Sequence, residues 1–155
     1  MTVSIRIGQK DDLPQTLALI KELAEYERAP LEVSNTIEMM EEDGFGENKI
    51  FDFFVAEHEN KIVGIAIYYM KYSTWKGKCL FLEDIVITES FRKFGIGSQL
   101  FEAVAKVAKE LNVERMEWQV LEWNEPAINF YKKYNAILDP EWINGKFTKE
   151  QLEKF

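Results

Sequence analysis

The sequence predicts an α+β protein built on a mixed sheet with helices on both faces. Segments with strand and helix patterning follow one another in the order β-α-α-β-β-β-α-β-α. Two of the strand segments, 62–72 and 79–88, are almost continuously apolar, which is typical of central strands covered on both faces. The chain of 155 residues is long enough for one continuous core and contains no repeat or linker, so we expect a single domain over 1–155.

The N-terminal part is expected to form a short strand at 4–7 and two helices. Asp11 and Asp12 can cap the first helix, with Pro14 in its first turn and an apolar stripe at helical spacing that comprises Leu17, Ile20, Leu23 and Ala24. The second helix is expected from about 34 or 35 to 43, ended by Gly44.

The middle and the C-terminal part alternate strands and helices. Strands are predicted at 51–56, 62–72 and 79–88, with a turn at Glu59 and Asn60 after the first. The helix after Gly97 has an apolar side made of Leu100, Phe101, Val104, Ala108 and Leu111. A strand at 113–121, a helix opened by Asn124 and Pro126, and a further strand near the end complete the prediction.

Composition excludes several classes of function. A net charge of −8 with no block of Lys and Arg argues against nucleic acid and favours a cationic partner. No apolar run approaches the roughly 20 residues that cross a bilayer, and the first eight residues lack signal-peptide patterning. One cysteine and one distant histidine offer no zinc site and no disulfide. We therefore expect a cytoplasmic protein without a metal.

A glycine-containing turn between a buried strand and a helix is the first candidate site. Glycines allow successive backbone N–H groups to point at a phosphate at the positive end of the helix, and two cations stand beside them. Gly-Lys-Ser/Thr is missing, and Leu100 replaces the third glycine of a dinucleotide fingerprint. An ordinary strand-to-helix turn is the alternative to phosphate binding at Arg92, Lys93, Phe94, Gly95, Ile96, Gly97 and Ser98.

Two further segments carry polar groups where apolar ones are expected. Glu83 and Asp84 interrupt an apolar strand, where unpaired buried carboxylates would be costly. Side chains alternate along a strand, so each faces one side of the sheet unless a bulge intervenes. In one interpretation, the two carboxylates lie at a strand end that reaches solvent. In the other, they lie at a split in the sheet and serve as a base or as an anchor for a cation. Asn124 is a good helix N-cap, and Tyr131 falls in an apolar stripe and can be a buried structural phenol.

These segments together resemble the GNAT acetyltransferase superfamily, and within it the diamine (spermidine/spermine-type) acetyltransferases. The signature Arg/Gln-x-x-Gly-x-Gly/Ala matches 92–97 between strand and helix. The segments Ile-Lys-Glu-Leu-Ala-Glu-Tyr-Glu at 20–27, Glu-Asp-Gly-Phe-Gly-Glu at 42–47, Leu-Glu-Asp at 82–84 and Glu-Trp-Asn-Glu-Pro at 122–126 also match, in the same order. The resemblance extends to about Trp142 and implies the GNAT fold, with a sheet splayed at its centre.

The resemblance implies acetyl-CoA as co-substrate, bound between the strands at 82–88 and 113–121. Its pantetheine arm would pair with exposed strand backbone and its pyrophosphate would lie on the turn at 92–98. The implied binding residues outside that turn are Ile85, Val86, Ile87, Asn124, Glu125, Pro126 and Ala127.

The implied chemistry is attack of a neutral amine on a thioester carbonyl, with Glu83 as base through water and Tyr131 as the acid that protonates the thiolate. Carboxylates and aromatic faces suit an aliphatic cation. The implied acceptor-site residues are Tyr26, Glu27, Glu83, Asp84, Glu117, Trp118, Gln119 and Trp142. Relatives are homodimers, so a homodimer is expected as well.

The sequence does not decide which amine is the acceptor. Asn135 replaces a glycine that ends the helix in most relatives, and 138–145 is shorter than in the mammalian diamine enzymes. Polyamines, diamines and lysine-like or thialysine-like amino acids are all compatible with the pattern. The alternatives are acetylation of a protein or peptide amine, and a domain that senses acetyl-CoA without turnover.

Overall fold

The computed structural model describes residues 1–155, which form two compact units, Met1–Gln119 and Val120–Phe155. A single domain over the whole chain stays a prediction. The first unit contains β1 (Ser4–Ile7), η1 (Lys10–Asp12), α1 (Leu13–Tyr26), η2 (Pro30–Glu32), α2 (Ile37–Phe45), β2 (Asp52–His58), β3 (Lys61–Ser73), β4 (Gly77–Ile87), η3 (Glu89–Phe91), α3 (Ile96–Glu110) and β5 (Arg115–Trp118). The second unit contains α4 (Glu125–Lys132) and α5 (Lys149–Leu152). No helix combines the length and the apolar character that a membrane span requires.

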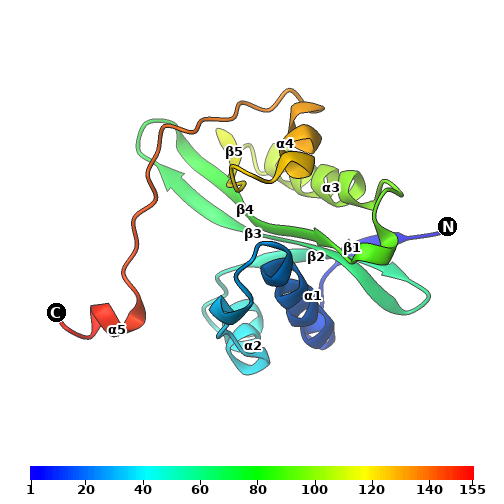
Figure 1. Cartoon of the computed structure of the whole chain (residues 1–155), viewed down its shortest axis with the longest axis horizontal. Helices are drawn as coiled ribbons and strands as arrows, with labels where there is room; N and C mark the ends of the chain where they lie inside the picture. Colours follow the sequence, from blue (N-terminus) through cyan, green and yellow to red (C-terminus); the bar gives the residue numbers. More distant parts are fainter. The chain divides into compact units, whose positions relative to one another are not determined.

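The sheet confirms the predicted fold class. Its five strands lie in the order β1-β2-β3-β4-β5, antiparallel except for the parallel pair β4–β5. Helices α1 and α2 cover one face and α3 covers the other (Figure 1). Pairing with β5 ends at Leu82, whereas β4 continues to Ile87. The far half of β4 therefore has an edge that β5 does not pair, which is the predicted splay.

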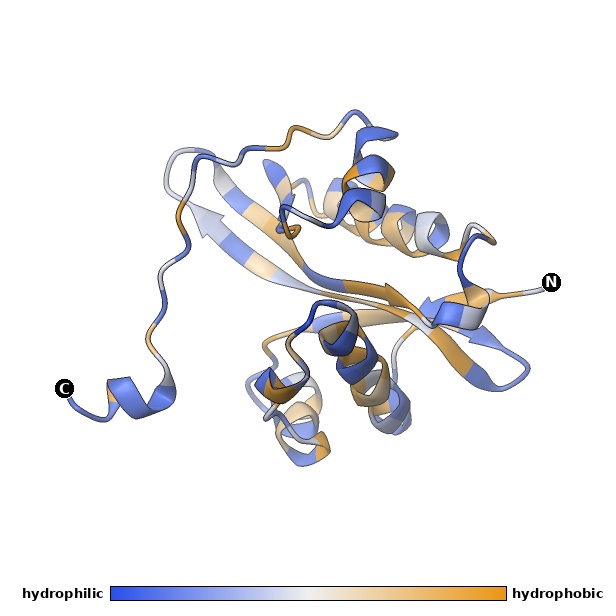
Figure 2. Ribbon diagram, viewed as in Figure 1, coloured by the Kyte–Doolittle hydropathy of each residue, from blue (hydrophilic) through white to orange (hydrophobic).

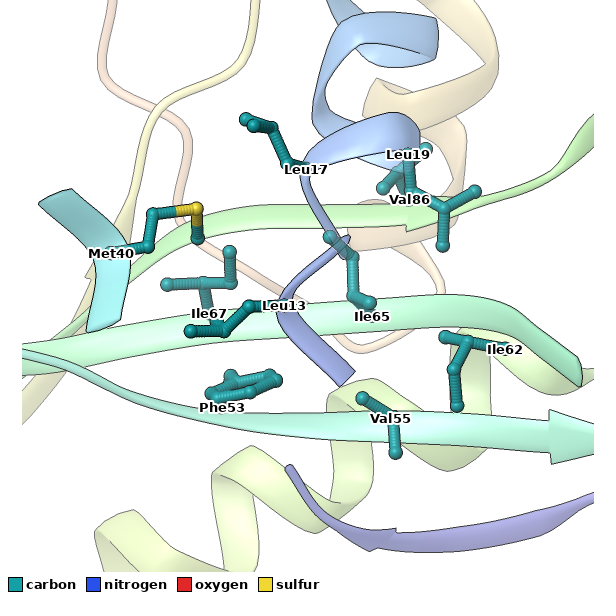
Figure 3. Packing of buried hydrophobic residues seen from close by; sticks show 10 residues of the cluster. All are labelled: Leu13, Leu17, Leu19, Met40, Phe53, Val55, Ile62, Ile65, Ile67 and Val86. Atoms are coloured by element: carbon teal, nitrogen blue, oxygen red, sulfur yellow. The ribbon is translucent and has the colours of Figure 1, made fainter. Parts of the chain in front are cut away.

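Apolar side chains from α1, α2 and strands β2–β4 form the core on one face (Figure 3). Leu13, Val55 and Ile65 are fully buried, and each such side chain contributes roughly 1.5–3 kcal/mol by leaving water. The predicted stripe of α1 supplies Leu17, with Ile20 and Leu23 packed around the cluster. Figure 2 shows that the sheet becomes hydrophilic toward the turn between β3 and β4. The apolar core therefore ends before that turn.

Helix α3 packs closely on the opposite face because β3 has a glycine beneath it. A Cβ at Gly64 would lie 2.7 Å from Ile87 Cδ1 and 3.1 Å from Leu100 Cδ1, closer than packing tolerates. The predicted apolar side of α3 is confirmed for Leu100, Phe101, Val104 and Ala108, which are buried. Leu111 follows the last turn and is 43% exposed, so its assignment to that side was wrong.

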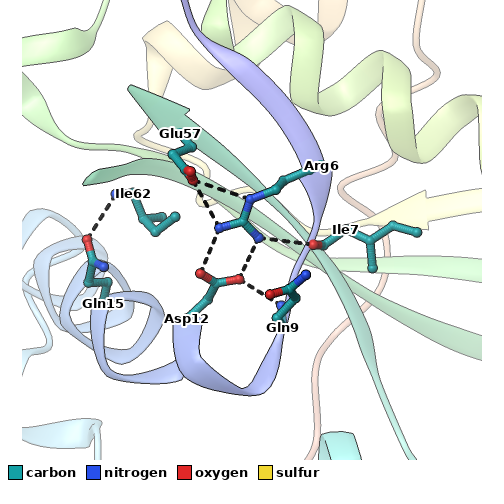
Figure 4. A network of polar contacts seen from close by, with 7 residues as sticks. All are labelled: Arg6, Ile7, Gln9, Asp12, Gln15, Glu57 and Ile62. Carbon is teal, nitrogen blue, oxygen red and sulfur yellow. Dashed lines mark hydrogen bonds and ion pairs between the residues drawn. The ribbon is translucent and has the colours of Figure 1, made fainter. Parts of the chain in front are cut away.

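A charged network ties β1 to the start of α1 (Figure 4). The Arg6 guanidinium donates to both carboxylate oxygens of Asp12, at 2.8 and 2.9 Å, and to Glu57. The hydrogen bond from Arg6 holds the pKa of Asp12 below its ordinary value. The Asp12 carboxylate also accepts a hydrogen bond from the Gln9 amide at 2.7 Å and therefore caps η1. The prediction that it caps α1 was wrong. Pro14 lies in the first turn of α1 as predicted.

Other boundaries differ from the prediction for local reasons. Helix α2 begins at Ile37 because the Thr36 hydroxyl accepts from the Met39 amide at 3.1 Å. It continues through Gly44, where a Cβ would lie 2.7 Å from the Phe51 ring, so this glycine allows packing and does not end the helix. The turn after β2 is confirmed by left-handed backbone at 59 and 60, with φ of 48° and 63°.

The two strand predictions for the C-terminal part need correction. Strand β5 spans only Arg115–Trp118, which pair with Cys79–Leu82, and the two strands do not pair beyond Leu82. No strand follows α4, so the further strand near the end was wrong. Residues 138–148 have no regular structure apart from the Thr148 cap of α5.

Candidate active site

A bulge in β4 brings the two adjacent carboxylates to the same face of the sheet. On β3, Ile67 is opposite Asp84 and the next residue, Tyr68, is opposite Leu82, so Glu83 is the extra residue. Asp84 shares the face of its partner Ile67, which belongs to the α1–α2 core. The Tyr69 hydroxyl donates to Glu83 at 3.3 Å, and Tyr69 lies on that same face two residues after Ile67. Strict alternation would have separated the two carboxylates.

The end of α1 adds a third carboxylate, and we call Glu27, Glu83 and Asp84 the acidic group. Glu27 directly follows the last residue of α1, which packs against β4. Burial raises the pKa of Glu27. Burial, together with the charges of Glu83 and Glu27, raises the pKa of Asp84 to about 7. The acidic group therefore lacks compensating positive charge, so a cationic ligand that binds there gains the most electrostatic stabilisation.

The predicted phosphate turn has the backbone that the sequence required. Lys93 and Gly95 are both left-handed, with φ of 70° and 78°, and α3 begins directly after Gly95. The first amides of a helix have no partner within it and lie at its positive end. Gly97 lies in the first turn of α3, and a Cβ there would meet only Ile87 Cγ1, at 3.9 Å, so the space beside this turn stays open. Phe94 is 56% exposed and Ile96 is buried as the first anchor of α3.

The side chain of Arg92 is directed to α1 and β4. Its Nε donates to the Ile87 carbonyl at 3.0 Å, its guanidinium lies 5.4 Å from the centre of the Tyr26 ring, and Glu22 is 3.9 Å away. Glu22 also accepts from the Thr88 hydroxyl and the Glu89 amide, at 3.0 Å each. Arg92 thus holds the entry to the turn, and phosphate binding by the turn stays a prediction.

The unpaired edge of β4 offers backbone groups to a ligand. The Thr88 amide donates to the Val63 carbonyl on β3, so by alternation the groups of Ile85 and Ile87 point away from β3. The Ile87 carbonyl is the one that accepts from Arg92. The Ile87 amide and both backbone groups of Ile85 remain on this edge, while the Val86 side chain is buried in the core.

The predicted stretch Glu117-Trp118-Gln119 divides between the two faces. Trp118 packs edge-on against Phe101 of α3, with ring centres 5.4 Å apart, so it lies on the face opposite the acidic group. Glu117 is opposite Phe81 and bonds to Lys71 at 2.8 Å and Arg115 at 2.9 Å. Gln119 follows the end of β5 and is exposed.

The second unit holds the remaining predicted residues, whose roles stay predictions. The Asn124 side chain accepts from the Ala127 amide at 3.4 Å and caps α4, with Glu125 and Pro126 in the first turn. Tyr131 is buried near the end of that helix, with its ring centre 5.3 Å from that of Phe130. Trp142 is 74% exposed, and its indole donates to Asp139 at 3.1 Å.

Four residues at the site were missed by the sequence reasoning. They lie beside Glu83 and Glu117 on the same face of the sheet, and they are Tyr69, Lys71, Phe81 and Arg115. The β3–β4 register brings Tyr69, Lys71 and Phe81 together, and the pairing of β4 with β5 adds Arg115. A prediction of the strands alone does not specify these registers. The structure contains no group of three or more His, Cys, Asp or Glu side chains arranged to hold a metal ion.

Comparison with known proteins identifies the family. Residues 17–136 match the Acetyltransferase (GNAT) family. The sequence is 38% identical to thialysine N-epsilon-acetyltransferase of Sus scrofa over 164 aligned positions, which cover 99% of this chain and 96% of that protein. It is 37% identical to the Caenorhabditis elegans protein of the same name, which covers 94% and 91%. It is also 34% identical to human spermidine/spermine N(1)-acetyltransferase-like protein 1, over 96% of this chain and 23% of that one.

Solved structures show the same fold. An integron cassette protein from the mobile metagenome of V. cholerae matches with a TM-score of 0.80 and 25% identity, over 99% of this chain and 97% of that one. An aminoglycoside acetyltransferase from a soil metagenome, solved with trehalose, matches with a TM-score of 0.77 and 21% identity, over 94% and 95%.

Proposed function

Because the chain belongs to the GNAT acetyltransferase family, we propose that it transfers acetyl from acetyl-CoA to a primary amine of a small cationic acceptor. One observation carries the proposal: β4 holds two carboxylates on one face, and the chain then passes through η3 and a turn to a helix N-terminus suited to a phosphate. An amine and a phosphorylated donor can therefore meet along one strand.

The donor would bind to the backbone groups of Ile85 and Ile87 and to the turn before α3. Pairing of an extended arm with an open strand edge is a common mode of recognition. The diphosphate would take the turn's amides and the charge of Lys93. Gly97 fits this role because nothing but Ile87 lies within 4 Å of its missing side chain.

The acceptor would enter as a cation and react as a neutral amine. An aliphatic amine with a pKa near 10 is mostly protonated at neutral pH, so a base must take its proton before attack. A new N–C bond then forms as the C–S bond of the thioester breaks. The thiolate takes a proton, for which Tyr131 is the proposed donor.

Two carboxylates of the acidic group are suited to act as the base. Glu83, acting through water, is the first candidate, and the hydrogen bond from Tyr69 orients it. Asp84 is the second, because a pKa of about 7 matches the working pH at which a general base is most effective. Glu83→Gln and Asp84→Asn separate the two: loss of the base is expected to lower kcat by about 100-fold or more, and the other variant by much less.

Two competing functions make different demands on the same site. A protein or peptide acetyltransferase needs room for a chain on both sides of the target amine, and a sensor of acetyl-CoA needs no acceptor. The proposed homodimer and cytoplasmic location are compatible with acetylation of a small amine, with protein or peptide acetylation and with acetyl-CoA sensing.

The test is CoA release from acetyl-CoA by the purified protein, with spermidine, spermine, putrescine, lysine, thialysine or a basic peptide as acceptor. The proposal requires turnover with at least one small amine that is well above turnover with the peptide. Turnover with the peptide alone would assign the chain to protein acetylation. Binding of acetyl-CoA in calorimetry without any turnover would assign it to sensing.

A further inference from the structure

A carboxylate of α1 holds the short segment between β4 and the turn before α3. Glu22 accepts from the Thr88 hydroxyl and from the Glu89 amide, at 3.0 Å each. Thr88 directly precedes η3, and its own side chain makes no cap hydrogen bond to that helix. The first amide of η3 has no partner within the helix, so Glu22 supplies the missing cap from a distant part of the chain.

The same carboxylate lies beside the cation with which the turn begins. A Glu22 oxygen is 3.9 Å from the Arg92 guanidinium, whose Nε donates to the Ile87 carbonyl of β4 at 3.0 Å. Glu22 and Tyr26 are four residues apart on α1 and therefore lie on the same side of the helix. The guanidinium is 5.4 Å from the centre of the Tyr26 ring. Arg92 is therefore held between the end of α1 and the end of β4.

The other end of η3 is held by β2. Phe91, the last residue of η3, packs against His58, with ring centres 5.3 Å apart. Nδ1 of His58 lies 2.7 Å from the Thr2 carbonyl oxygen, at hydrogen-bond distance. A 3₁₀ helix of three residues closes few hydrogen bonds of its own, so its position depends on such outside contacts.

The turn that follows η3 has two ends, and Glu22 fixes the first of them. At the second end, the buried side chain of Ile96 anchors the start of α3. Backbone amides bind an anion well only if they are already in place, because ordering them on binding costs free energy. The charge of Glu22 itself opposes a bound diphosphate, since like charges repel. Any help that Glu22 gives to donor binding must therefore come from the geometry that it imposes.

From these contacts we infer that Glu22 is a positioning residue for the donor. It holds η3 and Arg92 so that the amides of the following turn keep the arrangement that a diphosphate requires. The inference rests on the proposed function, in which the turn binds the diphosphate of acetyl-CoA, and it adds a residue of α1 outside that turn. Glu22 should therefore matter for donors that carry a diphosphate and not for donors that lack one.

Two simpler roles for Glu22 make different predictions. If Glu22 only ties α1 to the end of β4 for stability, its loss reduces the amount of folded enzyme and lowers turnover with every donor by the same factor. If Glu22 acts only as a negative charge near the turn, its loss strengthens the binding of a diphosphate. Only the positioning role predicts weaker use of a donor with a diphosphate and unchanged use of a donor without one.

The experiment compares kcat/KM for acetyl-CoA and for S-acetylpantetheine, which has the same thioester and arm but lacks the diphosphate and the nucleotide. The acceptor is the amine with the highest turnover, at a saturating concentration. The wild-type protein should prefer acetyl-CoA. Glu22→Ala should lower kcat/KM for acetyl-CoA by about 10-fold through a higher KM at unchanged kcat, the lower end of what hydrogen bonds to a charged group contribute. Its kcat/KM for S-acetylpantetheine should stay within about 2-fold of wild type.

Glu22→Gln separates geometry from charge, because the amide keeps an oxygen that can accept from Thr88 and Glu89. It should keep kcat/KM for acetyl-CoA within about 3-fold of wild type. Glu25→Ala is the matched control, since it removes the same charge from an exposed position of the same helix and should leave the preference for acetyl-CoA intact. If Glu22→Ala does not fold, Thr88→Val removes the hydroxyl that donates to Glu22 and should lower kcat/KM for acetyl-CoA by about 3-fold.

Four outcomes would contradict the inference. An equal fall for both donors in Glu22→Ala and Thr88→Val would overturn it in favour of stability alone. A rise in kcat/KM for acetyl-CoA in both Glu22→Ala and Glu22→Gln would overturn it in favour of a simple charge effect. Equal use of the two donors by the wild-type protein would overturn it while acetyl transfer itself stands. No turnover with either donor would overturn the proposed function together with the inference.

Discussion

Replacing Asp84 by asparagine should stabilise the protein at alkaline pH and not at acidic pH. Burial and the neighbouring carboxylates raise the pKa of Asp84 to about 7 in the folded chain, against an ordinary value of 3.8. The folded state therefore binds the proton more tightly than the unfolded state does. The stability that this proton gives is present below pH 4 and is lost as the pH rises from about 4 to about 7.

The size of the stability change follows from this difference between the pKa of Asp84 in the folded chain and its ordinary value. A rise of about three pH units corresponds to about 4 kcal/mol if the carboxylate is fully shielded from water. Asp84 is only half-buried, so we expect about 2 kcal/mol. Asp84→Asn removes the charge, and its stability advantage over the wild-type protein should be about 2 kcal/mol at pH 8 and close to zero at pH 4.

Urea denaturation followed by tryptophan fluorescence at both pH values measures this difference. With a slope of about 2 kcal/mol per M, the midpoint of Asp84→Asn should lie about 1 M above that of the wild-type protein at pH 8. The control is Asp11→Asn, whose exposed carboxylate should change stability by less than about 0.5 kcal/mol. Equal midpoints of Asp84→Asn and wild-type protein at pH 8 would refute the reasoning, because Asp84 would then carry no burial cost.

Three further predictions concern the donor site, the acid and the core. Gly97→Leu should fold, since leucine favours a helix, but should lose measurable acetyl-CoA binding in calorimetry; unchanged affinity would remove the turn from the donor site. Tyr131→Phe should lower kcat by about 100-fold with little change in the thermal midpoint, and a change within about 2-fold would leave Tyr131 a core phenol. Thr16→Val should stabilise the protein by about 1 kcal/mol in denaturation, because the buried Thr16 hydroxyl has no hydrogen-bond partner; a loss of stability would show that it has one.

The architecture of the first unit could be predicted because its signals are local. Apolar runs, a helix stripe and a two-residue turn with left-handed backbone at Glu59 and Asn60 each depend on neighbouring residues alone. The start of α2 was misjudged by two or three residues, since Asn35 and Thr36 are both acceptable caps and only Thr36 accepts from an amide of the first turn.

The site itself depends on pairing between strands, which local signals do not specify. The bulge at Glu83 exists only relative to its partner strand, so the sequence could not decide whether Glu83 and Asp84 share a face. The β3–β4 and β4–β5 pairings together bring Lys71 to Glu117. Trp118 alternates to the other face and packs on Phe101, although it adjoins Glu117 in the sequence.

The motif match did not predict the contacts that the Arg92 side chain makes. The match predicted a cation beside a phosphate, and the structure directs the guanidinium to Ile87, Glu22 and Tyr26. Because Glu27 directly follows α1, this contact connects the end of the helix beside the acidic group with the turn before α3. Sequence spacing alone could not reveal a connection between segments more than 60 residues apart.

Mass spectrometry of a reaction between acetyl-CoA and a small amine tests the central claim most directly. Purified protein would be incubated with acetyl-CoA and lysine, and the lysine and CoA products measured together over time. The account predicts monoacetylated lysine in equal amounts with released CoA, and a rate at least about 100-fold lower in a Glu83→Gln, Asp84→Asn double variant. Unmodified lysine, putrescine and spermidine after prolonged incubation with a sample that binds acetyl-CoA would contradict it.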